Sequence, residues 1–256
     1  MGRGCTMWRA GKARRSSSWP GWPQTWWAFH EIMPKLAESH RVIAVDIRGM
    51  GASDKPEGGY DKKNMAQDIY ELIQSLGLEK VHIVGHDIGG HIAYPFSVLY
   101  PEATLSTTYL DVGGLPASTS QMTLLPPQVL SGEFRKDFLI WWFAFHQVHG
   151  MPEQLIEGRA HIYLDWFWDS LLYHQDAITE FDRAVYANAY NTPAAIRAGD
   201  GWYQAYPQDL IDNASFPEKS MSPRWASVAW ATVCWLISWK IGSPTLRSFS
   251  LMSVIT

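Results

Sequence analysis

Cysteine is scarce in this 256-residue sequence, because Cys5 and Cys234 are its two thiols. Two thiols exclude a disulfide framework and any metal site built from several cysteines, and they favour a reducing, cytoplasmic location. A basic excess is also missing, since 21 Lys and Arg side chains stand against 25 Asp and Glu. The resulting net charge of −4 argues against nucleic acid as a partner, because polyphosphate backbones are held by positive surfaces.

Long apolar runs are absent as well. The longest, residues 225–239, contains Ser and Thr and falls short of the roughly 20 residues that span a bilayer. The first 18 residues carry five Lys and Arg side chains, but no apolar segment follows them, which excludes a secretory signal. We therefore expect no membrane partner.

Acidic side chains are missing from both ends of the chain. Residues 1–30 contain no Asp or Glu, and residues 219–256 contain no Asp, Glu, His, Asn or Gln. Natural protein surfaces rarely omit these residues for so long, and neither end shows a readable strand. We interpret both ends as products of a displaced reading frame or a misplaced gene boundary. The alternative is a genuine hydrophobic tail that packs or binds a partner.

The middle of the chain alternates in the manner of an α/β protein. Apolar, β-branched runs predict strands at residues 41–46 and 81–85,. Apolar residues at helical spacing predict a helix at 62–76 with Asp61 as its N-cap, and a second helix at 89–100,. This order of elements predicts a mostly parallel sheet with crossover helices.

Aromatic residues gather in the second half of the chain, where 15 lie between positions 141 and 206. Helical patterns cover residues 134–147, 152–174, 179–190 and 193–203,. Thr179 followed by Asp182 resembles a capping box at one helix start,. We predict a helical insert whose aromatic side chains form its core and, as a group, are suited to line an apolar cavity.

The sharpest chemical signal is the run Gly-His-Asp-Ile-Gly at residues 85–89, between a predicted strand and a predicted helix. Glycines on both sides allow a turn that exposes the central side chain at the top of a sheet, as in a nucleophile elbow. Asp87 would then be the nucleophile. The alternative is that Asp87 only caps the helix. We interpret the neighbouring His86 and His91 as packing or supporting groups.

These segments resemble the α/β-hydrolase family, in its branch of epoxide hydrolases and haloalkane or haloacetate dehalogenases. The resemblance covers about residues 19–217. The matching segments are Gly-Trp-Pro at 21–23, Asp-Ile-Arg-Gly-Met-Gly-Ala-Ser at 46–53 with Pro56 after it, the Asp87 turn, Leu-Asp at 110–111, and Gly150, Trp202 and Tyr203 in the insert. Pro20 departs from the family pattern, which has His there.

The resemblance implies an α/β-hydrolase core with a mostly parallel sheet and an inserted helical cap, whose C-terminal strands and helix are missing or disrupted. The predicted parts are an aberrant or disordered N-terminus at 1–18, the core at 19–115, the cap at 116–212, and an aberrant tail at 213–256 in place of the C-terminal core.

The resemblance also implies roles for individual residues. Asp87 would attack saturated carbon and form an ester, and the backbone N–H groups of Trp22 and Ile88 would hold the oxyanion. Asp111 matches an acid position that orients a C-terminal His, with a loop cap as the alternative. Every His lies at or before His174, so we expect the first half-reaction to survive and turnover to collapse. No metal or organic cofactor is implied.

The substrate-binding positions favour an epoxide. Haloalkane enzymes have Trp after the nucleophile and haloacetate enzymes have two nearby Arg, whereas this sequence has Ile88 and His91. Epoxide hydrolases hold the epoxide oxygen with two cap tyrosines. Tyr203 matches one of them, and Trp142 stands at the other position. The resemblance therefore implies a small apolar epoxide as substrate.

Three alternatives stay open at this stage. The chain could be a haloalkane or haloalkanoate dehalogenase-like hydrolase, a non-catalytic small-molecule binding protein, or a truncated or frame-shifted product. Its oligomeric state is also open, including a homo-oligomer. For the structure, we expect Asp87 at a strand-to-helix turn, Asp111 close by, and the aromatic insert covering both.

Overall fold

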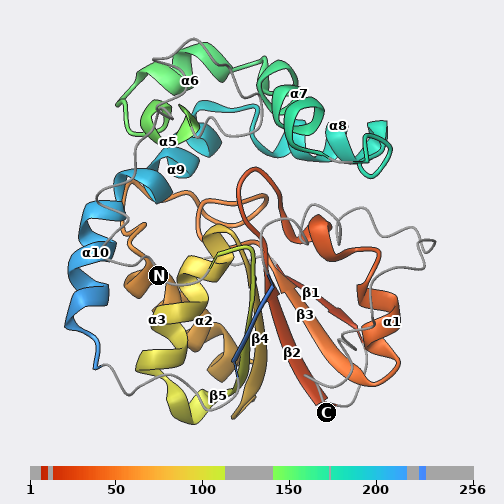
Figure 1. Cartoon of the computed structure of the whole chain (residues 1–256), viewed down its shortest axis with the longest axis vertical. Coiled ribbons are helices and arrows are strands. Elements are labelled where there is room, and N and C mark those ends of the chain that lie inside the picture. The colour runs from red at the N-terminus through yellow and green to blue at the C-terminus, as the bar shows by residue number, and fades with distance from the viewer. Residues whose placement is uncertain (1–6, 11–13, 113–140, 173, 218–224, 229–256) are drawn as a thin grey trace, which may run out of the picture.

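A six-stranded sheet forms the centre of the molecule (Figure 1). The computed structural model describes residues 7–10, 14–112, 141–172, 174–217 and 225–228. The strand order is β1-β3-β2-β4-β5-β6, with β1 antiparallel to β3 and the other neighbours parallel. The strands are β1 (Met7–Ala10), β2 (Arg14–Trp19), β3 (His40–Val45), β4 (Val81–His86), β5 (Thr104–Leu110) and β6 (Trp225–Val228). The predicted mostly parallel sheet is confirmed.

Helices cover both faces of this sheet, with α2 and α3 on one side and α1 on the other (Figure 1). These elements are η1 (Trp26–Phe29), α1 (Met33–Ala37), α2 (Lys62–Ser75), α3 (Ile88–Leu99) and η2 (Pro101–Ala103). Asp61 caps α2 as predicted, because its carboxylate accepts the Asn64 N–H at 2.9 Å. The buried face of α2 then packs on α3 and on α10 (Tyr206–Ser215).

The strand β2 corrects the expectation that the N-terminal end contains no readable strand. It lies between β3 and β4 and pairs with both. Its serines, Ser16, Ser17 and Ser18, are buried. Sequence patterns missed this strand because serine carries no apolar signal, whereas two neighbouring strands supply hydrogen bonds along its whole backbone.

In the C-terminal segment, the structure describes β6, which pairs in parallel with β5 from Thr107 to Leu110. The rest of residues 218–256 lies outside the described part of the chain. The predicted domain boundaries at 18, 115 and 212 stay predictions.

The structure describes the insert helices α5 to α9, which lie above the sheet (Figure 1), and α10, which follows them in the chain. They are α5 (Trp141–Phe145), α6 (Met151–Ile156), α7 (Ala160–Leu171), α8 (Glu180–Ala189), α9 (Pro193–Gln204) and α10 (Tyr206–Ser215). The capping box of Thr179 and Asp182 is confirmed. Among the described residues, no helix combines the length and apolarity needed to cross a membrane.

Two helix predictions in the insert need correction. The single helix predicted at 152–174 is wrong, because α6 ends before Gly158, which has a φ of +71°, and α7 begins after it. A left-handed glycine ends a helix at little cost, so the apolar periodicity on both sides hid the break. Of the helix predicted at 134–147, residues 134–140 lie outside the described part. The helix α10 was not predicted.

Candidate active site

Asp87 lies at a tight turn between β4 and α3, with φ +47° and ψ −116°. A non-glycine residue at positive φ is uncommon, and such strain gathers at functional sites. The surrounding glycines make room for the turn. A Cβ at Gly85 would collide with the Gly89 carbonyl, and a Cβ at Gly21 would collide with the Asp87 carboxylate. Asp87 occupies the N-cap position of α3, yet its side chain makes no capping hydrogen bond, so capping alone does not account for its place at this turn.

Two backbone N–H groups hold the Asp87 carboxylate. The N–H of Trp22 donates to Asp87 Oδ2 at 2.8 Å, and the N–H of Ile88 also bonds to this carboxylate. These are the two donors that the family resemblance assigns to the oxyanion. The Trp22 ring is fixed under the insert by edge contacts with Tyr190 and Trp202, at centroid distances of 4.5 and 6.0 Å. The arrangement can therefore stabilise negative charge beside Asp87.

The environment of Asp87 disfavours its charge but does not abolish it. Burial raises the pKa of Asp87 to about 6, while the N–H groups of Ile88 and Trp22 and the Lys62 ammonium lower it. Lys62 is itself buried, and its Nζ donates to Asp209 Oδ2 at 2.7 Å. At neutral pH, Asp87 is therefore an ionised carboxylate with few solvating groups, as a nucleophile requires.

Asp111 leaves the neighbouring strand beside Asp87. The register of β4 and β5 pairs His86 with Leu110, and each aspartate is the next residue of its strand. Burial raises the pKa of Asp111 to about 7, and the negative charge of Asp87 adds to this shift. Asp111 Oδ1 is buried and has no hydrogen-bond partner among the described residues. The structure thus brings the two predicted carboxyl groups together.

The two predicted substrate-binding residues share one aromatic layer. Tyr203 is 1% exposed, stacks on His146 at 4.9 Å and meets Phe143 edge-on at 5.3 Å. Burial raises the pKa of Tyr203 well above its usual value, and the charge of Asp87 raises it further. Trp142 is also buried and contacts Phe143 at 5.8 Å. Tyr203 therefore lies within electrostatic range of Asp87, and Trp142 is connected to it through Phe143.

Sequence reasoning missed Tyr206 and Lys62. The Tyr206 hydroxyl is buried without a hydrogen-bond partner in the described part of the chain, and Lys62 Nζ lies 4.7 Å from the centre of its ring. Burial and the charge of Asp87 raise the pKa of Tyr206 well above normal. The three-residue spacing from Tyr203 was an available signal for Tyr206. Lys62 gave none, because a lysine in a first helical turn usually faces solvent.

The histidines beside the turn contact other groups. His91 is buried and meets Tyr206 edge-on at 5.8 Å, and His86 Nδ1 lies 3.1 Å from Gln24 Oε1. Burial lowers the pKa of His86 to about 4, so its imidazole is neutral. In the described ranges, no group of three or more His, Cys, Asp or Glu side chains could hold a metal ion.

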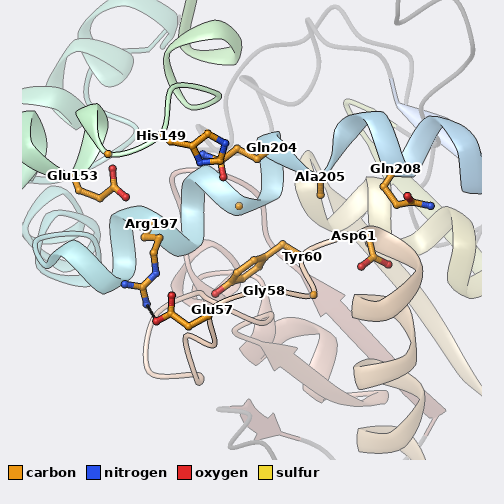
Figure 2. Close-up of a pocket in the computed structure, with 13 residues that line it drawn as sticks. Glu57, Gly58, Tyr60, Asp61, His149, Glu153, Arg197, Gln204, Ala205 and Gln208 are labelled. Carbon is orange, nitrogen blue, oxygen red and sulfur yellow. Dashed lines mark ion pairs between the residues drawn. The ribbon is translucent and has the colours of Figure 1, made fainter.

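A separate polar pocket of about 520 Å³ opens between a core loop and the helices α6 and α9 (Figure 2). Asp87, Asp111 and Tyr203 do not line it. The lining residues are Glu57, Gly58, Gly59, Tyr60, Asp61, His149, Gly150, Glu153, Arg197, Gly201, Gln204, Ala205 and Gln208. Arg197 Nη2 binds Glu57 Oε1 across it at 3.0 Å.

Comparison with known sequences finds one matching family profile, described as alpha/beta hydrolase fold, over residues 19–139. The chain is 35% identical over 198 residues to a soluble epoxide hydrolase from Corynebacterium sp. (strain C12), which covers 75% of this chain and 65% of the relative. It is 29% identical to a fluoroacetate dehalogenase from Burkholderia sp., which covers 72% of this chain and 60% of the relative. The chain thus spans less than two thirds of the length of these relatives.

Comparison with solved structures also finds an epoxide hydrolase. The epoxide hydrolase CorEH, solved without ligand, superposes with a TM-score of 0.73 at 32% sequence identity. The match covers 83% of this chain and 74% of CorEH.

Proposed function

Because this chain belongs to the α/β-hydrolase fold family, we propose that it opens small apolar epoxides by forming an ester on Asp87. The setting of the Asp87 carboxylate carries the proposal, because this carboxylate lies at a strained turn, binds the Trp22 N–H at 2.8 Å, and is partly buried within electrostatic range of Tyr203. A carboxylate in this setting suits attack on saturated carbon, whereas the serine of a common nucleophile elbow suits acyl carbon.

The first half-reaction balances with groups of this chain. A carboxylate oxygen of Asp87 attacks an epoxide carbon, the C–O bond breaks, and its electron pair goes to the epoxide oxygen. The Tyr203 hydroxyl donates a proton to that oxygen, and the tyrosinate regains its proton from water. Because the pKa of Tyr203 is raised well above normal, the free enzyme keeps this phenol protonated. The product is a hydroxyalkyl ester of Asp87.

The second half-reaction needs a base that activates water. Water attacks the ester carbonyl, and the N–H groups of Trp22 and Ile88 are placed to hold the oxyanion. Asp111 would orient an imidazole base, but the sequence contains no His after His174. We therefore expect this 256-residue chain to hydrolyse the ester slowly, and the ester to accumulate.

The side chains next to Asp87 favour an uncharged substrate. Ile88, the residue after the nucleophile, is fully buried and apolar, so this position offers no cation for a substrate carboxylate. The 29% identity to a fluoroacetate dehalogenase nevertheless makes halide displacement the second candidate. In that reaction Asp87 would displace halide from saturated carbon and form the corresponding ester.

Mass spectrometry tests the proposal directly. The purified chain is incubated with styrene oxide, and in a parallel sample with chloroacetate, before intact-mass analysis and peptide mapping. We expect one styrene oxide adduct on Asp87, no adduct in D87N, and little adduct from chloroacetate. Absence of any adduct on folded wild-type protein would favour the non-catalytic binding protein. A chloroacetate adduct alone would favour the dehalogenase, and steady multiple turnover would reveal a base that the sequence comparison overlooks.

A further inference from the structure

A chain of four polar side chains runs through the interior of the insert. His146, just after α5, places Nδ1 at 2.6 Å from Asp200 Oδ1 of α9. Its other nitrogen, Nε2, lies 2.7 Å from the hydroxyl of Tyr163 of α7. His146 and Asp200 are 0% and 1% exposed. Glu153 of α6 faces Asp200 closely enough that its carboxyl group raises the pKa of Asp200, and we call these four residues the cap network.

The protons at His146 can be assigned from chemistry. Burial lowers the pKa of His146 to about 3, so the imidazole is neutral and carries one N–H. Burial raises the pKa of Tyr163 well above normal, so its phenol keeps its proton. Tyr163 O–H therefore donates to Nε2, and Nδ1–H donates to Asp200 Oδ1.

The carboxyl groups of Asp200 and Glu153 share a proton, and we infer this from the oxygens that lack a donor. Asp200 Oδ2 and Glu153 Oε2 are both buried, and neither meets a donor group in the described part of the chain. Two carboxylate oxygens can bond only if one carries a proton. Burial, followed by the charge of Glu153, raises the pKa of Asp200 to about 8. One proton is therefore held between Asp200 and Glu153 at neutral pH.

The cap network ends against the candidate active site. The His146 ring stacks on Tyr203 at 4.9 Å and 15°, and it meets the Trp22 ring edge-on at 4.8 Å and 80°. Tyr203 is the proposed proton donor, and the Trp22 N–H holds Asp87. A histidine fixed through both ring nitrogens thus sets the plane of the Tyr203 ring.

We propose that Glu153, Asp200, His146 and Tyr163 form a proton-sharing positioning unit that holds Tyr203 against the nucleophile. The role of Tyr203 in this statement rests on the proposed function, whereas the shared proton does not. The rings of Tyr203 and Trp22 pack against His146. Glu153 also lines the polar pocket, whose other titratable side chains are Glu57, Tyr60, Asp61, His149 and Arg197 (Figure 2).

The shared proton predicts a particular dependence of stability on pH. The pKa of Asp200 is raised in the folded protein from its ordinary value of 3.8 to about 8. Its contribution is therefore fully present below pH 4 and is lost as pH rises through 8. In D200N the amide donates to Glu153 and its carbonyl accepts from His146 without any titration. The variant E153Q acts in the same direction, because its amide can donate to an ionised Asp200.

The first experiment measures Tm of wild type, D200N, E153Q and the exposed control D176N between pH 5 and pH 9. We expect D200N and E153Q to match wild type near pH 5 and to exceed it by several degrees at pH 8.5, whereas D176N follows wild type throughout. A Tm difference that is constant with pH in both variants would overturn the shared proton.

The second experiment measures the rate of Asp87 alkylation by styrene oxide. We expect D200L and H146L to lower the maximal rate at least tenfold without changing the half-saturating concentration, and D200N to restore most of the rate that D200L loses. The exposed control is H161Q. Equal rates in all folded variants would overturn the positioning role. If wild type itself forms no adduct, the proposed function fails, and with it the positioning of a catalytic Tyr203, while the Tm experiment still decides the shared proton.

Discussion

At the scale of single residues, the site combines two partly buried carboxyl groups with few compensating charges. Asp87 and Asp111 leave adjacent strands, and burial raises the pKa of both, to about 6 and about 7. Groups this close titrate as a pair, so the observed midpoints belong to both residues together. The pair places the change from neutral acid to nucleophile close to neutral pH.

This titration should appear in the alkylation rate. We expect the rate with styrene oxide to fall about tenfold for each pH unit below 6, because only ionised Asp87 attacks. D111N should leave a single titration instead of a coupled one. The measurement is adduct formation by mass spectrometry between pH 4.5 and pH 8.5, and a flat profile would exclude Asp87 as the group that titrates.

The ionisation of Asp87 should also make the free energy of unfolding depend on pH, in a direction that follows from its raised pKa. The folded pKa of Asp87 lies above its ordinary value of 3.8, so its contribution is complete below pH 4 and is lost as pH rises through 6. D87N should therefore be more stable than wild type at pH 7.5, by at most about 3 kcal/mol for a shift of this size. Urea unfolding at pH 4.5 and 7.5 provides the comparison.

At the scale of elements, one buried ion pair joins the start of α2 to α10. Lys62 donates from its backbone N to Asp209 Oδ1 and from Nζ to Asp209 Oδ2, both at 2.7 Å. Nζ also donates to the Trp202 carbonyl of α9. This single lysine therefore connects the core to two helices of the insert and its exit.

Removing that lysine should be costly. K62M leaves the Asp209 carboxylate buried without its cation, and we expect it to lower the free energy of unfolding by about 3–5 kcal/mol. K62M/D209N should recover part of the loss, because the asparagine still accepts the backbone N–H without carrying a charge. The adjacent exposed Lys63 supplies the control K63M, which should stay within about 0.5 kcal/mol of wild type. Equal losses in K62M and the double variant would contradict this account.

At the scale of the whole molecule, buried hydrogen bonds attach the insert to the core. Trp202 Nε1 donates to the Arg48 carbonyl at 2.9 Å, and the Tyr190 hydroxyl donates to the Gln24 carbonyl at 2.6 Å. A buried carbonyl that loses its donor costs about 1–3 kcal/mol. Specific hydrogen bonds, in addition to apolar packing, therefore hold the insert over Asp87.

The substitution W202F tests this attachment. It removes the donor to Arg48 and part of the ring volume, so we expect a loss of about 2–4 kcal/mol in urea unfolding and faster limited proteolysis of the insert. W166F is the control, because Trp166 is partly exposed on α7. If proteolysis of the two variants proceeds at the same rate, the bond to Arg48 does not hold the insert.

The sequence predicted those features whose signals are local. The Asp61 cap, the Thr179 capping box and the glycine-flanked turn at Asp87 each depend on residues within a few positions of one another. Lys62 with Asp209, and His146 with Asp200, depend on partners from distant segments, and a single sequence does not state which distant residues meet. The strand β2 was missed because its buried side chains are serines.

That same strand has a consequence for synthesis. Residues of β2 leave the ribosome before either of its neighbours, and Ser16 pairs with Val42 and His82, which are made much later. An apolar strand that stays unpaired until its neighbours are synthesised would be prone to intermolecular association. The serines of β2 expose little hydrophobic surface during this interval. The nascent chain can therefore keep this central strand unpaired in water until both of its neighbours have left the ribosome.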